Sequence, residues 1–168
     1  MAMSSAKPVL HMICGKIASG KSTLAQQIVV ECVAVRISED EWLAKLFGDQ
    51  MSSIADFARC SEKLRDAMGP HVLELLGAGV SVVLDFQANT VSSRQWLRSL
   101  IDCSGVDHVL HVLDVPDAVC KARLERRNAS GSHEFMVSES QFDQIAEYFV
   151  PPAEDERFNT VTHRGGGL

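Results

Sequence analysis

The stretch GKIASGKST (Gly15–Thr23) decides the fold of this chain. It follows a short apolar run, VLHMIC (Val9–Cys14), and precedes apolar side chains at helical spacing. It matches GxxxxGK[ST] at every specified position. Because glycine lacks a Cβ, such a loop lets successive backbone NH groups approach an anion, and the helix that follows adds its dipole. The stretch therefore predicts a phosphate-binding loop between a buried strand and a helix.

The loop residues take distinct predicted roles. Lys21 is expected to reach the β and γ phosphates of a nucleoside triphosphate, and the Ser22 hydroxyl is expected to bind Mg²⁺. A glycine-rich turn without a ligand is the alternative, and the flanking strand and helix argue against it. No [NT]KxD or LSGGQ-like segment is present, which disfavours a GTPase and a transporter ATPase. The predicted nucleotide-binding residues of the loop are Gly15, Lys16, Ile17, Ala18, Ser19, Gly20, Lys21, Ser22 and Thr23, with the Lys16 side chain solvated.

Apolar runs and helical spacings alternate along the rest of the chain. After the first strand, strands are expected at 35–37, 80–86, 107–115 and 158–162, the last one at an edge. Strands separated by helical segments of about ten or more residues indicate parallel pairing with right-handed crossovers. The predicted fold is α/β, a three-layer sandwich with its site at the carboxyl ends of the strands.

Several local signals predict where helices begin and end. Gly69-Pro70 is expected to kink or split a long helix that begins near Ile54 and ends at Gly77. Pro151-Pro152 is expected to stop the last helix. Capping-box spacing marks two helix starts, at Ser38/Glu41 and at Ser138/Gln141.

Composition limits the class of protein. At 168 residues with 46% apolar residues, one domain over 1–168 with a full core is expected, and 164–168 read as a flexible tail. The net charge of −6 disfavours a long nucleic acid or an anionic membrane as the partner, so a small molecule fits better. No run of about 18 apolar residues is present for a membrane span.

The cysteines and histidines favour a reduced, zinc-free protein. The five cysteines are odd in number and lack a CxxC pair, which indicates buried reduced thiols and a cytoplasmic location. They are Cys14, Cys32, Cys60, Cys103 and Cys120. The six histidines have no ligand spacing, so no structural zinc is expected.

Carboxylates follow two of the expected strands. Asp40 could orient an acceptor hydroxyl and take its proton, although an acid in the first turn of a helix is favoured by the dipole alone. Asp85 ends an apolar strand and is the expected second Mg²⁺ ligand. Glu39 and Glu41 are expected to be solvated or to cap the helix, and Asp114 to cap the helix that follows it.

Basic residues cluster in KARLERRN (121–128), before the loop NASGSHEF. Arg123 and Arg127 are four residues apart, so both could face one ligand while a lid near 128–137 closes over it. They join Asp40 and Lys21 in the predicted catalytic set, and Arg123 is also expected to bind the nucleotide. A solvated basic helix end is the alternative. Whether Arg126 or Arg127 is the lid arginine stays open, and three other arginines that could hold an anion are expected to be structural or exposed: Arg59, Arg65 and Arg94.

Taken together, these segments resemble the small phosphate-loop kinases grouped with zeta toxins, chloramphenicol phosphotransferase, polynucleotide 5'-kinase, and gluconate and shikimate kinases. The chain looks closest to AAA domain-containing ATP-dependent kinases of bacteria, and the resemblance covers 9–161. The segments that carry it, besides the glycine loop, are SEDEW (38–42), VVLDF (82–86), LDVPDAVCKARLERRN (113–128) and FVPP (149–152).

The resemblance implies ATP as the donor, Mg²⁺ as cofactor, Asp40 as the base, and a lid that delivers arginine. It also implies a five-stranded parallel sheet with the loop strand near its centre. Ala18 departs from the family, where many members have glycine, and DFQANT varies among relatives, so the roles of Gln87 and Asn89 stay open.

The sequence therefore predicts an ATP-dependent kinase that phosphorylates a hydroxyl of a small molecule. Two alternatives remain at this stage. One is a nucleotide sensor that binds or slowly hydrolyses ATP and acts through a protein partner. The other is a nucleic-acid 5'-hydroxyl kinase, which the negative charge disfavours. The acceptor and the oligomeric state are not readable from the residues.

Overall fold

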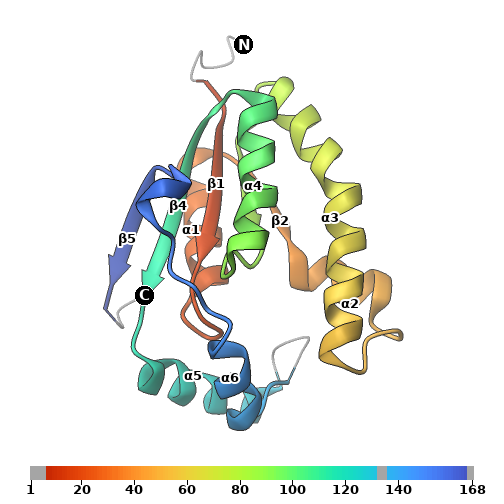
Figure 1. Cartoon of the computed structure of the whole chain (residues 1–168), viewed down its shortest axis with the longest axis vertical. Helices are drawn as coiled ribbons and strands as arrows, with labels where there is room; N and C mark the ends of the chain where they lie inside the picture. The colour runs from red at the N-terminus through yellow and green to blue at the C-terminus, as the bar shows by residue number, and fades with distance from the viewer. Residues whose placement is uncertain (1–6, 132–135, 166–168) are drawn as a thin grey trace.

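The computed structural model describes residues 7–131 and 136–165. At its centre these residues form a five-stranded parallel sheet in the order β2-β3-β1-β4-β5. The strands are β1 (Val9–Cys14), β2 (Val35–Ser38), β3 (Val82–Asp85), β4 (Asp107–Asp114) and β5 (Thr160–Arg164). The predicted parallel sheet, the central place of β1 and the edge position of β5 are confirmed (Figure 1).

Helices cover both faces of the sheet, which gives the three predicted layers. The helices are α1 (Lys21–Cys32), α2 (Glu39–Phe47), α3 (Ile54–Gly77), α4 (Val91–Ser104), α5 (Asp117–Ser130) and α6 (Glu139–Ala146). One core joins strand residues such as Leu10 and Leu84 to α3 and α4 (Figure 1). A second core joins Ile13 and Val83 to α1, α5 and α6. Because β1 is buried on both faces, its sequence is almost continuously apolar.

Pro70 does not split α3. The helix runs from Ile54 to Gly77 through Gly69-Pro70. A Cβ on Gly69 would lie 3.7 Å from the side chains of Leu100 and Trp96 on α4, so the glycine lies where the two helices pack. Residues on both sides of the proline belong to the same core, and this packing outweighs the lost backbone hydrogen bond.

The last helix ends earlier than Pro151-Pro152 indicates. The capping box of Ser138 and Gln141 starts α6 as predicted, but the helix stops at Ala146. Beyond it, the NH of Val150 donates to the carbonyl of Asn89 (2.9 Å). Arg94 Nη1 donates to the Val150 carbonyl (2.8 Å). Contacts with the start of α4, which are distant in sequence, therefore determine the path of this segment.

Two predicted caps differ in the structure. The Ser38 hydroxyl accepts from the NH of Glu41 (3.4 Å), but the Glu41 side chain pairs with Arg36 instead of completing the box. Asp114 does not cap α5, because Pro116 occupies the N-cap position. Asp114 is exposed and lies 3.9 Å from Arg164 Nε.

Three of the cysteines are buried and two are not. Cys14, Cys60 and Cys120 are buried free thiols, as predicted, whereas Cys32 and Cys103 are exposed on helix surfaces. The predicted tail also begins too early. Arg164 is the last residue of β5, and 166–168 lie outside the described residues.

Over 7–131 and 136–165, no helix has both the length and the apolar character needed to cross a membrane.

Candidate active site

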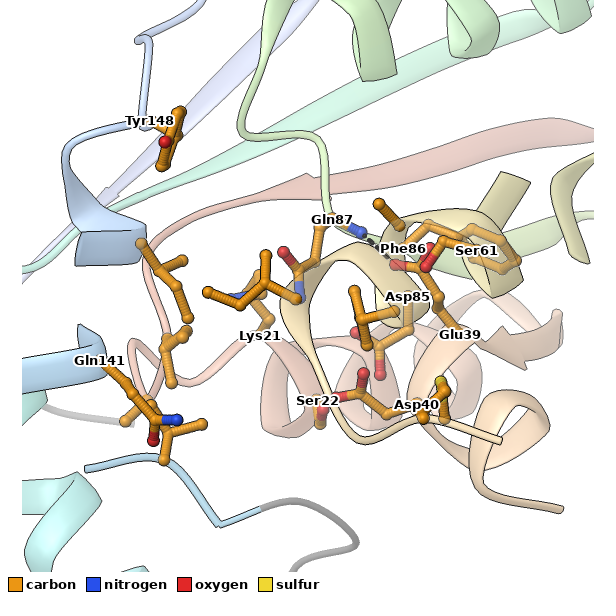
Figure 2. A pocket seen from close by; sticks show the side chains of 18 of the residues that line it. Lys21, Ser22, Glu39, Asp40, Ser61, Asp85, Phe86, Gln87, Gln141 and Tyr148 are labelled. Carbon is orange, nitrogen blue, oxygen red and sulfur yellow. Dashed lines mark hydrogen bonds between the residues drawn. The ribbon is translucent and has the colours of Figure 1, made fainter. Parts of the chain in front are cut away.

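One cavity of about 900 Å³ opens at the carboxyl ends of the strands (Figure 2). Its walls come from the loop after β1, the start of α2, the first half of α3, the residues after β3, and from α5 and α6. This is the position that parallel α/β sheets use for ligands, because loops diverge there and helix N-termini face inward.

The glycine loop keeps its shape through close backbone packing. A Cβ on Gly15 would lie 2.7 Å from Ser19 Oγ and 3.1 Å from Leu113 Cβ, so only glycine fits. The NH of Gly15 donates to Asn89 Oδ1 (3.0 Å), which gives Asn89 a structural role that the sequence left open. Gly20 has φ of +104° at the N-cap of α1. Ala18 has φ of +58°, a left-handed conformation that costs a residue with a Cβ about 1 kcal/mol or more.

Six residues of the predicted loop line the cavity: Ile17, Ala18, Gly20, Lys21, Ser22 and Thr23. Gly15, Lys16 and Ser19 are not among the residues that line the cavity. The Lys16 side chain is not simply solvated, because it pairs with Asp117 and lies 5.6 Å from the centre of the Phe149 ring.

The Lys21 side chain reaches back to the first residues of the loop. Its Nζ donates to the carbonyls of Gly15 (2.7 Å) and Lys16 (2.8 Å). Burial lowers the pKa of Lys21, while the carboxylates of Asp85 and Asp40 oppose this shift. The ammonium therefore interacts electrostatically with both predicted carboxylates, Asp85 and Asp40.

Asp40, Asp85 and Ser22 present oxygen atoms to the same part of the cavity (Figure 2). Asp85 is largely buried, and Arg36 Nη1 donates to its Oδ2 (3.2 Å). Among the described residues, no three His, Cys, Asp or Glu side chains form a metal site by themselves. Mg²⁺ usually takes one or two carboxylates plus substrate phosphate oxygens, so Ser22 and Asp85 fit that ion next to a bound polyphosphate.

Helix α5 brings the two predicted arginines to the cavity. Arg123 and Arg127 both line it, and Arg123 Nη1 donates to the carbonyl of Ser19 (3.1 Å). Arg126 is exposed, and its Nε donates to the Ala122 carbonyl of its own helix (3.4 Å). Arg127 therefore lines the cavity, whereas Arg126 is not among its lining residues.

The described parts of the predicted lid are tied together. Asn128 Nδ2 donates to the carbonyl of Val137 (2.7 Å). Lys121 Nζ pairs with Asp143 (2.7 Å) and Glu139 (3.2 Å), which fastens α5 to α6. Residues 132–135 of the predicted lid lie outside the described residues.

Glu39 is a cavity residue that the sequence did not reveal. It is 1% exposed, so the expectation of a solvated or capping residue is wrong. Its Oε2 accepts from the NH of Gln87 (3.1 Å), and its Oε1 accepts from Arg65 Nη2 (3.4 Å). Burial raises the pKa of Glu39, against the opposing effects of Arg65 and this backbone NH. No local signal could have shown this, since the partners are 26 and 48 residues away.

The three arginines that were expected to be structural or exposed, Arg59, Arg65 and Arg94, differ in role. Arg59 is exposed and pairs with Asp56 (2.7 Å). Arg94 is fully buried, where it pairs with Glu156 (2.7 Å) and donates to the carbonyl of Ala88. Both are structural or exposed, in line with the prediction. Arg65 lines the cavity, which places it in the site.

The comparison with known families explains this arrangement. A model of a family described as "AAA domain" matches residues 10–152. The chain belongs to this family. No curated protein matches this AAA domain.

Solved structures share the fold of this AAA domain at low identity. A candidate kinase from Chloroflexus aurantiacus has a TM-score of 0.77 at 16% identity, over 96% of this chain and 87% of that one. Kti12 from Chaetomium thermophilum, in complex with ADP-AlF3, has 0.66 at 15%, over 92% and 87%. A gluconokinase from Sinorhizobium meliloti has 0.63 at 20%, over 94% and 83%. The chain therefore has the fold of P-loop kinases.

Proposed function

We propose that this AAA domain is an ATP- and Mg²⁺-dependent kinase that transfers the γ-phosphate to a hydroxyl of a small molecule. The observation that carries the proposal is the meeting of the glycine loop and Asp40 in one cavity, with Lys21 in electrostatic reach of Asp40 and Asp85. A polyphosphate bound by the loop would end beside Asp40. The gluconokinase and the ADP-AlF3 complex among the similar folds are consistent with this chemistry.

The residues divide the work of phosphoryl transfer. Backbone NH groups of the loop bind the phosphates, and the ammonium of Lys21 offsets charge on the transferred group. Arg123 and Arg127 approach the same region from α5. Mg²⁺, held by Ser22 and Asp85, would supply further neutralisation of phosphate charge. Asp40 orients the acceptor hydroxyl in line with the phosphate and accepts its proton on a carboxylate oxygen.

The sensor alternative differs in one outcome. A sensor binds or hydrolyses ATP but phosphorylates no acceptor, whereas the kinase forms a phosphorylated product. The nucleic-acid kinase alternative predicts salt-dependent binding of an oligonucleotide, which the net charge of −6 disfavours.

Replacing Asp40 by Asn tests the proposal. Calorimetry with Mg²⁺ and a non-hydrolysable ATP analogue should show nearly unchanged affinity, while transfer to an acceptor falls by about 10² to 10⁴-fold because the general base is lost. Asp49→Asn is the matched control, since Asp49 is exposed just after α2. Equal loss of binding and transfer in D40N would contradict the assigned role. Product identification by mass spectrometry separates transfer from hydrolysis.

A further inference from the structure

The chain between α6 and β5 packs against the residues that lead into α4 (Figure 1). The NH of Val150 donates to the Asn89 carbonyl (2.9 Å), and Arg94 Nη1 donates to the Val150 carbonyl (2.8 Å). Residues 149–156 are called the C-terminal segment below. None of these described residues lines the cavity, yet the segment is joined to the glycine loop through Asn89.

Asn89 is bonded to both parts of the chain. Its backbone carbonyl accepts from the C-terminal segment, and its side-chain Oδ1 accepts from the NH of Gly15 (3.0 Å). Cys14 Sγ also donates to this oxygen (3.6 Å). Because Gly15 is buried, its NH would lose its partner if the Asn89 oxygen were removed. Asn89 therefore fixes the first residue of the glycine loop.

The carbonyl of Gly15 is held by a different group. Lys21 Nζ donates to this carbonyl (2.7 Å) and to that of Lys16 (2.8 Å). The ammonium has three N–H donors, and under the proposed function the phosphates compete for them. Asn89 is not among the described residues that line the cavity, so its bond to the loop meets no such competition. This bond can hold the loop both before and after a nucleotide binds.

A buried arginine holds the C-terminal segment beside Asn89. Arg94 is fully buried, and it pairs with Glu156 through two bonds, Nε to Oε2 (2.7 Å) and Nη2 to Oε1 (2.9 Å). Its Nη1 donates to the carbonyls of Ala88 (2.9 Å) and Val150. Ala88 directly precedes Asn89, so one guanidinium fixes both sides of this contact. Removing the carboxylate would leave a buried charge without its partner.

A second contact joins the glycine loop to the C-terminal segment. Lys16 Nζ lies 5.6 Å from the centre of the Phe149 ring. Lys16, Asn89 and Phe149 also line one small cleft, separate from the main cavity. The segment therefore meets the loop at Lys16 as well as through Asn89.

We propose that Asn89 is a positioning residue for the glycine loop, and that the buried pair of Arg94 and Glu156 keeps it in place through the C-terminal segment. The inference rests on the nucleotide-binding part of the proposed function, and adds that residues outside the cavity set the affinity for ATP. The physical reason is that a nucleotide binds only the molecules whose loop has the competent conformation, so the apparent affinity falls with that fraction.

Asn89→Leu tests the positioning role. The substitution keeps the approximate size of the side chain and removes the acceptor oxygen. Calorimetry with Mg²⁺ and AMPPNP should show a Kd about tenfold higher or more, because the buried NH of Gly15 loses its partner. Leu76→Ala is the matched control, since Leu76 is buried near the end of α3 and does not line the cavity. Both variants should lower Tm, but L76A should leave Kd within about twofold.

Glu156→Gln tests the more distant link. It keeps the shape of the side chain and removes the charge that pairs with Arg94. The Kd for AMPPNP should rise about threefold or more, although the substitution lies outside the cavity. Glu154→Gln is the matched control, because Glu154 is exposed in the same 3₁₀ turn (Glu154–Glu156), and it should leave Kd unchanged.

Hydrogen exchange in the unchanged protein gives a readout that a merely structural segment would not move. Binding of AMPPNP should slow the exchange of the Val150 NH and its neighbours, because coupling between two sites is reciprocal. Amides in the last turn of α3, which is remote from the C-terminal segment in sequence, should change less. In E156Q, this added protection of the segment should shrink.

The outcomes separate the inference from the proposed function. An unchanged Kd in N89L, or an equal loss of affinity in L76A, overturns the positioning role and leaves the kinase standing. An unchanged Kd in E156Q overturns the link to the C-terminal segment. If the unchanged protein binds no AMPPNP, the proposed function itself fails. If N89L does not fold, E156Q and hydrogen exchange decide in its place.

Discussion

The two ends of the cavity are built in opposite ways. The proposed phosphate end is the glycine loop with Lys21, a single continuous segment, and two arginines from α5 line the cavity beside it. The other end of the cavity, which we propose binds the acceptor and call the acceptor end, is made of residues from three parts of the chain, with Glu39 on α2, Arg65 on α3 and Gln87 after β3. Under the proposed function, a polyphosphate is recognised by the local geometry of one segment, whereas the acceptor is recognised by a surface that is assembled from distant segments.

Burial affects the charged groups at the two ends in opposite directions. It lowers the pKa of Lys21 and raises the pKa of Glu39, because in both cases burial disfavours the charged form. Nearby opposite charges resist both shifts: Asp85 and Asp40 for the lysine, Arg65 for the glutamate. At both ends, the neighbouring opposite charges therefore favour the charged form.

The largest expected effect is a loss of phosphoryl transfer when only the phosphate end is changed. Lys21→Met removes the ammonium that would offset charge on the transferred phosphate, so transfer should fall by about 10² to 10³-fold or more. Single-turnover kinetics measure it. Lys45→Met, on the exposed end of α2, serves as control. The contrast between the ends would fail if K21M weakened acceptor binding as much as nucleotide binding.

A smaller expected effect concerns the pH dependence of the stability of the sheet, which should not depend on either end of the cavity. His11, His111 and His163 form a row across β1, β4 and β5, with ring nitrogens 3.1 and 3.0 Å apart. Burial, and then the neighbouring histidines, lowers the pKa of His111 to about 4. Because the unfolded state binds this proton first, the free energy of unfolding should fall by up to about 3 kcal/mol as the pH drops from 6.5 toward 4.

Urea unfolding between pH 4 and 8 measures this slope. His111→Gln should flatten it, and His71→Gln, at an exposed position of α3, should not. A slope that is unchanged in H111Q would show that other groups control acid sensitivity. The slope should be the same with and without bound nucleotide, because the histidine row does not line the cavity.

A further prediction of similar size tests the packing of the loop without changing its charge. Gly15→Ala places a Cβ 2.7 Å from Ser19 Oγ and 3.1 Å from Leu113 Cβ, so unfolding free energy should fall by about 1 to 3 kcal/mol and nucleotide affinity should fall with it. Gly77→Ala is the matched control, since nothing lies within 4 Å of a Cβ there. Equal effects of the two substitutions would mean that the loop tolerates the extra carbon.

The smallest expected effect concerns the backbone conformation of Ala18 in the same loop. Ala18→Gly relieves a residue with φ of +58° but adds chain entropy to the unfolded state, so stability should rise by less than about 1 kcal/mol. Thermal unfolding measures it against Ala122→Gly, which lies inside α5 and should destabilise by a similar amount. A loss of stability in A18G would indicate that the Ala18 methyl packs favourably, since it lines the cavity.

Features that depend on neighbours in sequence were predictable, and those that depend on distant contacts were not. The loop, β1 and the capping box of α6 follow from short patterns. The continuous course of α3 through Pro70 depends on its packing against α4, and the early end of α6 depends on bonds from Asn89 and Arg94. Asp114 was wrongly predicted to cap α5, because the N-cap residue of this helix is Pro116, two residues further along the chain.

The sequence by itself determined the parallel α/β fold and the phosphate end, because a turn of bare backbone followed by a helix is a local property of about nine residues. Only the tertiary structure decided that Glu39 is buried, that Arg65 lines the same cavity as its partner, and that Arg127 rather than Arg126 lines this cavity. The physical reason is that burial and ion pairing depend on which surfaces meet, and residues far apart along the chain meet only when the sheet and its helices are assembled.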